Sequence, residues 1–208
     1  MTSASTEEYL EAIYRLTEKR EKVTTTNISR LLSVAPASVT EMLRRLEKEG
    51  YLKHEPYGDI TLTGKGAGVG KKIVKRHRII ERFLQMLGLQ KNKLHEEACR
   101  LEHAVSDDVE RALDSGLGFP EKSPTGMPIP RGDCKSLVEL KAGGRGVVVG
   151  ITGGRNVVQR LSDMGLTPGS EVKVLKLLPQ GPVEVATRGS RLALGRGVAM
   201  KITVEVRP

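Results

Sequence analysis

Hydrophobic residues recur at helical spacing through the first half of the chain and in short alternating runs through the second half. Residues 5–19 have apolar side chains three and four positions apart, which predicts an amphipathic helix with Thr6 as its N-cap. Threonines at 24–26 precede a second apolar set and predict another helix with a hydroxyl cap. Pro36 fits the first turn of a third helix, which Gly50 ends.

Two short strands are predicted directly after these helices. Residues 51–54 and 60–62 have the strand pattern, and Pro56, Gly58 and Asp59 form the turn between them. Helix, short turn, helix and hairpin in this order is typical of a winged helix-turn-helix. The alternative is a helical hairpin whose charges are simply solvated.

The helix that begins at Pro36 is the predicted recognition helix. Short side chains at its start let the backbone approach base edges, and arginines further along reach phosphates. Residues of the hairpin wing contact the backbone or the minor groove. The predicted DNA contacts are Thr26, Pro36, Ala37, Ser38, Thr40, Glu41, Arg44, Arg45, Lys53, His54 and Tyr57.

Two long apolar helices are predicted at residues 67–88 and 92–114. Next to a DNA-binding arm, such helices suggest the interface of a homodimer. A two-fold dimer places two recognition helices about one DNA turn apart, roughly 34 Å. The alternative is that these helices only complete the core of one monomer.

The last part of the chain changes character. Residues 115–133 are crowded with Gly and Pro and have no period, which predicts a linker. Short β-rich runs at 146–151, 171–177, 182–186 and 199–206, with one helix near 156–164, then predict a small β-barrel. The expected fold is mainly α with β. Its predicted segments are a DNA-binding domain at 1–64, a helical metal-binding and dimerisation domain at 65–115, a linker at 116–133 and an SH3-like barrel at 134–208.

Charge separates the chain into basic ends and an acidic middle. Residues 1–80 have a net charge of +5, residues 81–115 of −3 and residues 116–208 of +7, within a total of +9. This distribution suggests a polyanion partner and a separate cation-binding region. Aromatic residues make up only 3%, with no Trp, which disfavours base stacking on single strands and leaves duplex DNA.

Composition also limits the cellular setting. No apolar run approaches the roughly 20 residues of a membrane span, and acids stand where a signal peptide has a basic patch. We therefore expect a cytoplasmic protein without a membrane partner. The two cysteines, Cys99 and Cys134, stand in dissimilar contexts, which suggests free thiols or a metal ligand rather than a disulfide framework.

Metal-ligating side chains gather in the middle of the chain. The run H-E-E-A-C-R-L-E-H from His95 to His103 puts Cys99, Glu102 and His103 on one helix face at i, i+3 and i+4. Sulfur, oxygen and nitrogen donors on one face suggest half of a metal site. The alternative for each pair is a solvated or salt-bridged helix face. Two further pairs have helical spacing, namely His77 with Glu81 and Glu8 with Glu11.

The order of these motifs resembles the DtxR/MntR family of iron- and manganese-dependent repressors. The resemblance covers about the first 130 residues, through T-E-E-Y-L-E-A-I-Y, V-A-P-A-S-V-T-E-M-L-R-R-L-E-K-E-G-Y-L, K-R-H-R-I-I-E-R-F-L and H-E-E-A-C-R-L-E-H. The tail, with R-L-S-D-M-G-L-T-P-G-S-E-V, resembles the FeoA-type barrel. The resemblance implies a metal-dependent repressor of metal-homeostasis genes that binds double-stranded operator DNA, with the metal as co-repressor.

The resemblance also implies which residues bind metal. Glu8, Cys99, Glu102 and His103 match the activating site, and His77, Glu81 and His95 match the second site of iron-type members. Glu11, with His77, matches positions that manganese-type members use. The thiolate favours Fe²⁺ and the extra carboxylate favours Mn²⁺, so we expect Fe²⁺ with Mn²⁺ as the alternative, and Zn²⁺, Co²⁺ or Ni²⁺ as surrogates. The stretch 154–157 offers only Arg and Asn as polar side chains, which argues against a ligand from the barrel.

Two other classes of function were weighed against a repressor. An enzyme is disfavoured because H-E-x-x-H, G-x-S-x-G and a P-loop are all missing, and no small-molecule substrate is expected. The glycine-rich run 64–70 lacks the P-loop order and is interpreted as a flexible lead into a helix. The second alternative is an iron-handling adaptor that acts through the FeoA-like barrel, without DNA.

Overall fold

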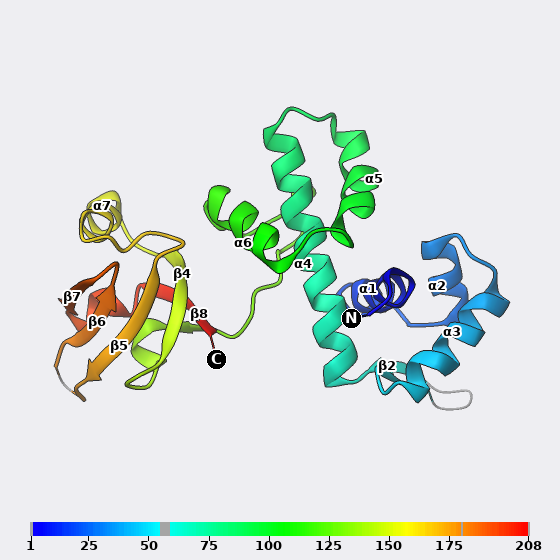
Figure 1. Cartoon of the computed structure of the whole chain (residues 1–208), viewed down its shortest axis with the longest axis horizontal. Coiled ribbons are helices and arrows are strands. Elements are labelled where there is room, and N and C mark those ends of the chain that lie inside the picture. The colour runs from blue at the N-terminus through cyan, green and yellow to red at the C-terminus, as the bar shows by residue number, and fades with distance from the viewer. Residues whose placement is uncertain (1, 55–58, 180, 208) are drawn as a thin grey trace. The chain divides into compact units, whose positions relative to one another are not determined.

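The computed structural model describes residues 2–54, 59–179 and 181–207 and divides into two compact units (Figure 1). One unit comprises Met1–Glu110 with Lys122–Pro130, and the other comprises Arg111–Glu121 with Arg131–Pro208. Pro56 and Gly58 of the predicted wing turn and the predicted DNA contact Tyr57 lie outside the described residues. None of the helices in the described part of the chain is long and apolar enough to cross a membrane.

The first unit begins with the elements that the sequence predicts for a winged helix-turn-helix. Ser3, rather than the predicted Thr6, caps the first helix, and Thr6 is buried within it. Thr24 caps the second helix as predicted and accepts a hydrogen bond from the Asn27 amide at 3.1 Å. The elements are α1 (Ala4–Glu18), α2 (Thr25–Leu32), α3 (Pro36–Lys48), β1 (Leu52–His54) and β2 (Ile60–Leu62).

One small core holds this region together. Residues spaced three and four apart on α3 turn Val39, Leu43 and Leu46 inward, where all are fully buried. They pack in one cluster with apolar residues of α1, α2 and the hairpin, in which β1 and β2 pair antiparallel. The opposite side of α3 therefore stays in solvent.

The long helix α4 (Gly64–Met86) packs against α1 (Figure 1). The helix begins at Gly64, so the run 64–70 is helical and the interpretation as a flexible lead is wrong. Gly70 is buried, and a Cβ atom there would lie 2.5 Å from the Leu10 carbonyl oxygen. Gly70 thus allows close helix packing, because a side chain at this position would separate α4 from α1.

The predicted helix at 92–114 is two helices, α5 (Lys91–Glu102) and α6 (Asp107–Gly116). The hydroxyl of Ser106 accepts a hydrogen bond from the Val109 amide at 3.3 Å, and acids follow in the first turn of α6. A hydroxyl followed by acids starts a new helix, and apolar periodicity alone does not reveal this.

The apolar residues of α4 and of the helices that follow it divide into a buried set and an exposed set. Ile73, Ile79 and Ile80 are buried inside the single chain, so this part of the predicted dimer face completes the monomer core. Large apolar side chains remain exposed further along, namely Met86, Leu87, Leu101 and Val109.

Part of the predicted linker folds onto the first unit. Arg78, only 4% exposed, donates to the Pro128 carbonyl oxygen and pairs with the Glu18 carboxylate. A turn is closed by a 2.8 Å hydrogen bond from the Ser123 amide to the Met127 carbonyl oxygen. The segment 122–130 is therefore attached to α1 and α4.

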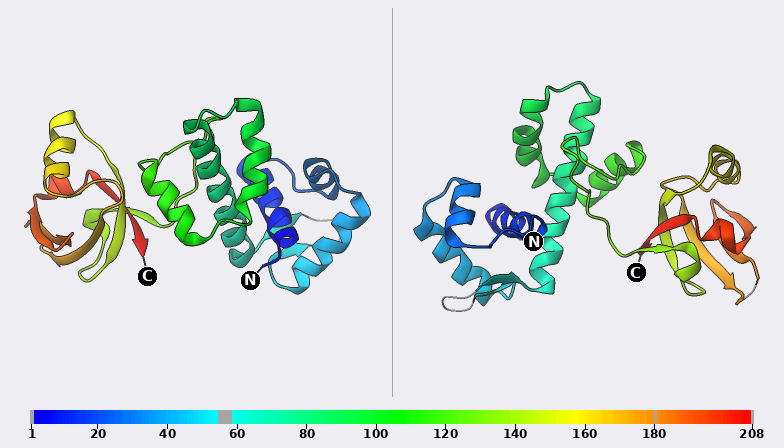
Figure 2. Two further views of the ribbon diagram at one scale, coloured as in Figure 1. Left: turned by 45° about the horizontal axis from the view of Figure 1, so that its top comes forward. Right: turned by 180° about the vertical axis from the view of Figure 1, so that it is seen from behind.

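The second unit is a curved antiparallel sheet with α7 outside it, as Figure 2 shows. The strand order is β3-β8-β4-β5-β6-β7, and apolar residues from alternate positions fill its interior. Three predicted strands and the helix are present, the predicted strand at 199–206 starts later, and β3 and β7 were not predicted. The elements are β3 (Cys134–Ser136), β4 (Arg145–Ile151), α7 (Arg155–Asp163), β5 (Glu171–Leu177), β6 (Val183–Thr187), β7 (Ser190–Leu194), α8 (Arg196–Ala199) and β8 (Ile202–Arg207), with a 3-10 turn at Leu137–Glu139.

Candidate metal centre and DNA-binding face

His77 stands at the centre of a buried cluster built by α1, α4 and α5. Its side chain is only 1% exposed. The Nδ1 atom lies 2.7 Å from Oε2 of Glu102, and Nε2 lies 3.2 Å from Oε1 of Glu81. Glu81 follows His77 by one helical turn, whereas Glu102 comes from the end of α5. The cluster therefore joins α4 to α5.

His95 and Cys99 extend this cluster from the α5 side. The Nδ1 atom of His95 is 3.0 Å from Nε2 of His77 and 3.8 Å from the Glu81 carboxylate. The Cys99 sulfur is 3.9 Å from Nδ1 of His77 and 3.8 Å from Nε2 of His95. The residues predicted for the second site thus lie together, and Cys99 lies beside them.

Within residues 2–54, 59–179 and 181–207, two sets of three donors have ligand atoms within 4.8 Å of one another. One is His77, His95 and Cys99, and the other is Glu11, His77 and Glu102. Glu11 comes from α1 and is buried, so the second set spans α1, α4 and α5. Arg15 donates to Glu11 from Nε at 2.8 Å and balances part of the negative charge.

The electrostatics of the cluster depend on burial and on these contacts. Burial alone lowers the pKa of His77, but hydrogen bonds with Cys99, Glu102 and Glu81 raise it to about 11. Hydrogen bonds with Cys99 and Glu81 raise the pKa of His95 to about 9. Burial raises the pKa of Glu81, but His77 and His95 outweigh it and hold that pKa at about 2. A cation bound by these residues would have to displace imidazolium protons.

Burial and neighbouring charges also set the pKa values of Glu11 and Cys99. Burial and the nearby Glu102 raise the pKa of Glu11, although Arg15 opposes them. Burial also raises the pKa of the Cys99 thiol, but its two histidine neighbours outweigh this and lower it. A thiol with a lowered pKa and buried carboxylates are suitable donors for a divalent cation.

The two remaining predicted ligands, Glu8 and His103, belong to neither set of three donors. Glu8 is exposed, but it lines a small pocket together with Glu11, Cys99 and Glu102. His103, at the end of α5, is 3.6 Å from the Glu102 carboxylate and 2.9 Å from the carboxylate of Glu7. Glu7 was not predicted. The available signal was its i, i+4 spacing to Glu11, which places both on one face of α1.

The donor chemistry fits a divalent transition-metal ion. Imidazole nitrogen, thiolate sulfur and carboxylate oxygen are present together, and this mixed set suits Fe²⁺, Zn²⁺, Co²⁺ and Mn²⁺ better than Ca²⁺ or Mg²⁺. Among the residues that the structure describes, both candidate donor sets lie in the helical unit.

The predicted DNA contacts on α3 face solvent. Arg44 is exposed, and Arg45, also exposed, pairs with Glu49 at 2.9 Å. Thr40 is half-buried and donates to the Pro36 carbonyl oxygen at 3.0 Å. In the wing Lys53 is exposed and His54 is half-buried. The other exposed members of the predicted set are Thr26, Pro36, Ala37, Ser38 and Glu41.

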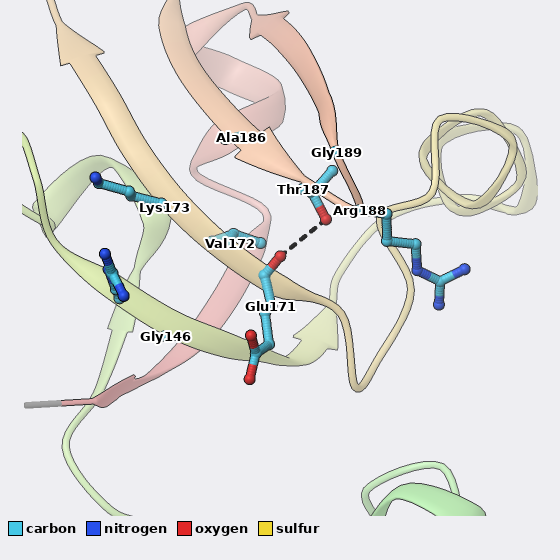
Figure 3. A pocket seen from close by; sticks show the side chains of 9 residues that line it. Gly146, Glu171, Val172, Lys173, Ala186, Thr187, Arg188 and Gly189 are labelled. Atoms are coloured by element: carbon cyan, nitrogen blue, oxygen red, sulfur yellow. Dashed lines mark hydrogen bonds between the residues drawn. The ribbon is translucent and has the colours of Figure 1, made fainter.

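The barrel has a separate pocket, of about 360 Å³, lined by strands β4, β5 and β6. In Figure 3, Lys173 and Arg188 lie on opposite sides of Glu171, and the Thr187 hydroxyl donates to the Glu171 carbonyl oxygen at 2.9 Å. Glu171 is the one carboxylate among the described residues that line this pocket. A single carboxylate between cations is a poor donor set for a metal, so this pocket does not resemble the helical cluster.

Three family models match successive parts of the chain. Residues 1–60 match "Iron dependent repressor, N-terminal DNA binding domain", and residues 63–131 match "Iron dependent repressor, metal binding and dimerisation domain". Residues 135–206 match the FeoA domain. The matches follow the same order along the chain as the helix-turn-helix, the donor cluster and the barrel.

Similar proteins and structures agree with these matches. The iron-dependent repressor IdeR of Mycobacterium tuberculosis is 31% identical over 223 residues, which cover 97% of this chain and 96% of that protein. The regulator MntR of Bacillus subtilis is 39% identical over 122 residues, 58% of this chain and 86% of that protein. A solved manganese-dependent transcriptional repressor in complex with manganese has a TM-score of 0.56 at 30% identity, covering 97% of this chain and all of that one.

The chain therefore belongs to the iron-dependent repressor family, also called the DtxR/MntR family, and it has a C-terminal FeoA domain. The resemblance and the fold class expected from the sequence are confirmed.

Proposed function

We propose that this protein is a cytoplasmic transcriptional repressor that binds double-stranded operator DNA as a homodimer when a divalent metal ion occupies the cluster around His77. The observation that carries the proposal is the origin of Glu11, His77 and Glu102 in three different helices, with ligand atoms within 4.8 Å of one another. Glu11 is on α1, which packs in the same core as the recognition helix α3. His77 and Glu102 come from the other two helices, α4 and α5.

The cluster couples the metal to the orientation of the DNA-binding region. Buried carboxylates on α1 and α5 repel one another, and His77 and Arg15 balance them in part. A bound divalent cation supplies the charge that lets these carboxylates share one location. Glu11 then keeps α1 against α5, and α3 is held through the shared core. To shift the protein from 1:99 to 99:1 in favour of the DNA-binding conformation, the metal must bind that conformation more tightly by about 5.5 kcal/mol.

Iron is the metal that we propose. The Cys99 sulfur lies among imidazoles, and a thiolate favours Fe²⁺ over Mn²⁺. Glu8 and Glu11 line the neighbouring pocket and favour a harder ion, so a manganese-responsive repressor is the second candidate. The ligands proposed are Glu8, Glu11, His77, Glu81, His95, Cys99, Glu102 and His103.

The proposed dimer and DNA contacts use surfaces that the single chain leaves open. Met86 and Leu87 at the end of α4 are 62% and 64% exposed, more than expected for large apolar side chains without a partner. The exposed side of α3 with Arg44 is the proposed DNA-binding face. The relatives are transcription regulators rather than enzymes, and we propose no catalytic role.

The test is an anaerobic titration of Fe²⁺, Mn²⁺ and Zn²⁺ against binding to duplex DNA from upstream of the chain's own gene. Fluorescence anisotropy should show tight binding only with metal, reversed by a chelator. A scrambled duplex of equal length is the control. Equal affinity of the metal-free and metal-loaded protein for the same duplex would contradict the proposal, and no DNA binding under any condition would favour an adaptor role.

A further inference from the structure

His103 is held by a carboxylate on α1 that the sequence patterns do not single out. The Nδ1 atom of His103 lies 2.9 Å from Oε2 of Glu7, and its Nε2 atom lies 3.6 Å from Oε1 of Glu102. Both side chains are largely buried, with 18% of His103 and 17% of Glu7 exposed. One ring nitrogen therefore faces α1, and the other faces a proposed ligand on α5.

The carboxylate of Glu7 decides which nitrogen carries the proton. An ionised carboxylate only accepts hydrogen bonds, so Nδ1 of His103 is the donor in this contact, and in the neutral ring with this tautomer the lone pair is on Nε2. Histidines that bind metals usually donate the other N–H to a carboxylate or carbonyl, which sets the tautomer and the orientation of the ring. Glu7 has this relation to His103.

The second oxygen of Glu7 is also engaged. The Thr2 hydroxyl donates to Oε1 of Glu7 at 2.7 Å. With one oxygen on Thr2 and the other on His103, Glu7 is suited to orient the imidazole rather than to bind a cation itself.

We propose that Glu7 is a positioning residue of the metal centre, which fixes His103 with Nε2 directed to the ion and thereby links the start of α1 to the ligands of α5. This inference rests on the proposed metal centre. It adds a contact by which docking of α1 prepares a ligand, in addition to the direct donors Glu8 and Glu11.

The experiment is a competition titration of the full chain with Zn²⁺, followed by ¹⁵N NMR of the histidine side chains. In the wild type, His103 should bind Zn²⁺ through Nε2 and carry its proton on Nδ1. Glu7→Ala should weaken Zn²⁺ binding roughly 10–100-fold and remove the single tautomer of His103. Glu7→Gln keeps an acceptor oxygen and should fall between the two. Glu21→Ala, which removes an exposed carboxylate, should equal the wild type.

Two results would overturn the inference. One is Zn²⁺ affinity of both Glu7 variants within about twofold of the wild type, a difference below about 0.4 kcal/mol. The other is ligation of His103 through Nδ1 in the wild type. Either result leaves metal-dependent DNA binding by the wild type intact. Loss of the proposed function would show instead as a wild type that binds Zn²⁺ normally but does not bind DNA. Circular dichroism of each variant confirms its fold.

Discussion

The Arg78 guanidinium of α4 pairs with the Glu18 carboxylate of α1, and the same guanidinium donates to the carbonyl oxygen of Pro128. Arg78 is nearly fully buried, so its charge depends on these partners. One side chain thus joins α1, α4 and the segment 122–130.

We expect Arg78→Met to destabilise the helical unit by about 3–5 kcal/mol, because it leaves the Glu18 carboxylate without its buried partner. Urea unfolding followed by far-ultraviolet circular dichroism measures this. The matched control is Arg100→Met, because Arg100 pairs with Glu96 in an exposed location where such pairs contribute about 0–1 kcal/mol. Similar losses in both variants would show that the burial of the Arg78 pair does not matter.

Cys99→Ala should reduce affinity for Zn²⁺ and Co²⁺ more than affinity for Mn²⁺. The variant removes the sulfur donor and leaves Glu11, His77 and Glu102 in place, and thiolates prefer the softer ions. For Zn²⁺ we expect at least the roughly 10–100-fold loss that follows when only a ligand's orienting partner is removed. Competition titration with a fluorescent chelator measures it. Cys134→Ala, at the exposed cysteine of the barrel, is the control and should bind as the wild type does.

Metal uptake should release protons and become tighter as the pH rises. Because the pKa of His77 is raised to about 11 and that of His95 to about 9, the cluster holds imidazolium protons at pH 7, and a cation must displace them. Affinity therefore falls as the pH drops from 8 to 6. Isothermal titration in two buffers of different protonation enthalpy should show about one to two protons released per ion. A binding enthalpy independent of the buffer would contradict this.

Two glycines of α4 should respond to alanine in opposite directions. At Gly70 a Cβ atom would lie 2.5 Å from the Leu10 carbonyl oxygen and 2.8 Å from Cβ of Tyr14, so Gly70→Ala should cost about 1–3 kcal/mol through overpacking. At Gly68 an added Cβ atom would meet no neighbouring atom within 4 Å. Gly68→Ala should therefore stabilise the helix by up to about 1 kcal/mol. Thermal unfolding of both variants measures the difference, and equal effects of the two substitutions would contradict close packing of α4 on α1 at Gly70.

Arg44→Ala should weaken DNA binding to all sequences and reduce the slope of log K against log salt by about one. The exposed position of Arg44 on α3 fits a phosphate contact rather than a core role. Anisotropy titrations at several salt concentrations give the slope. Lys176→Ala removes an exposed cation of the barrel and should leave the slope unchanged if only α3 contacts the duplex.

Much of the fold was predictable because local rules agree with tertiary packing. Thr24 and Pro36 mark helix starts that the structure keeps, and the apolar spacing of α3 selects its buried side. The break after α5 was missed because apolar spacing continues across it, and only the Ser106 cap reveals it. In the barrel, β7 has only the five residues S-R-L-A-L, and its strand pairing depends on β6.

The candidate site was predictable by residue type and less so by grouping. Helical spacing identified His77, Glu81, Cys99 and Glu102 as neighbours on their own helices. Which residues meet across helices depends on how α1, α4 and α5 pack, and this put Cys99 beside His77 and Glu7 beside His103. Sequence spacing contains no information about rotation of one helix relative to another.

The early end of α5 has an electrostatic consequence. Because the helix stops at Glu102 with His103 as its C-cap, Cys99, Glu102 and His103 all belong to its last turn. The carbonyl groups of that turn carry the partial negative charge of the peptide dipoles, which stabilises a nearby cation by about 0.3–1 kcal/mol. A continuous helix to residue 114 would have moved that negative pole three turns away from the donors. The interruption thus gives positive ions of any identity a more attractive location.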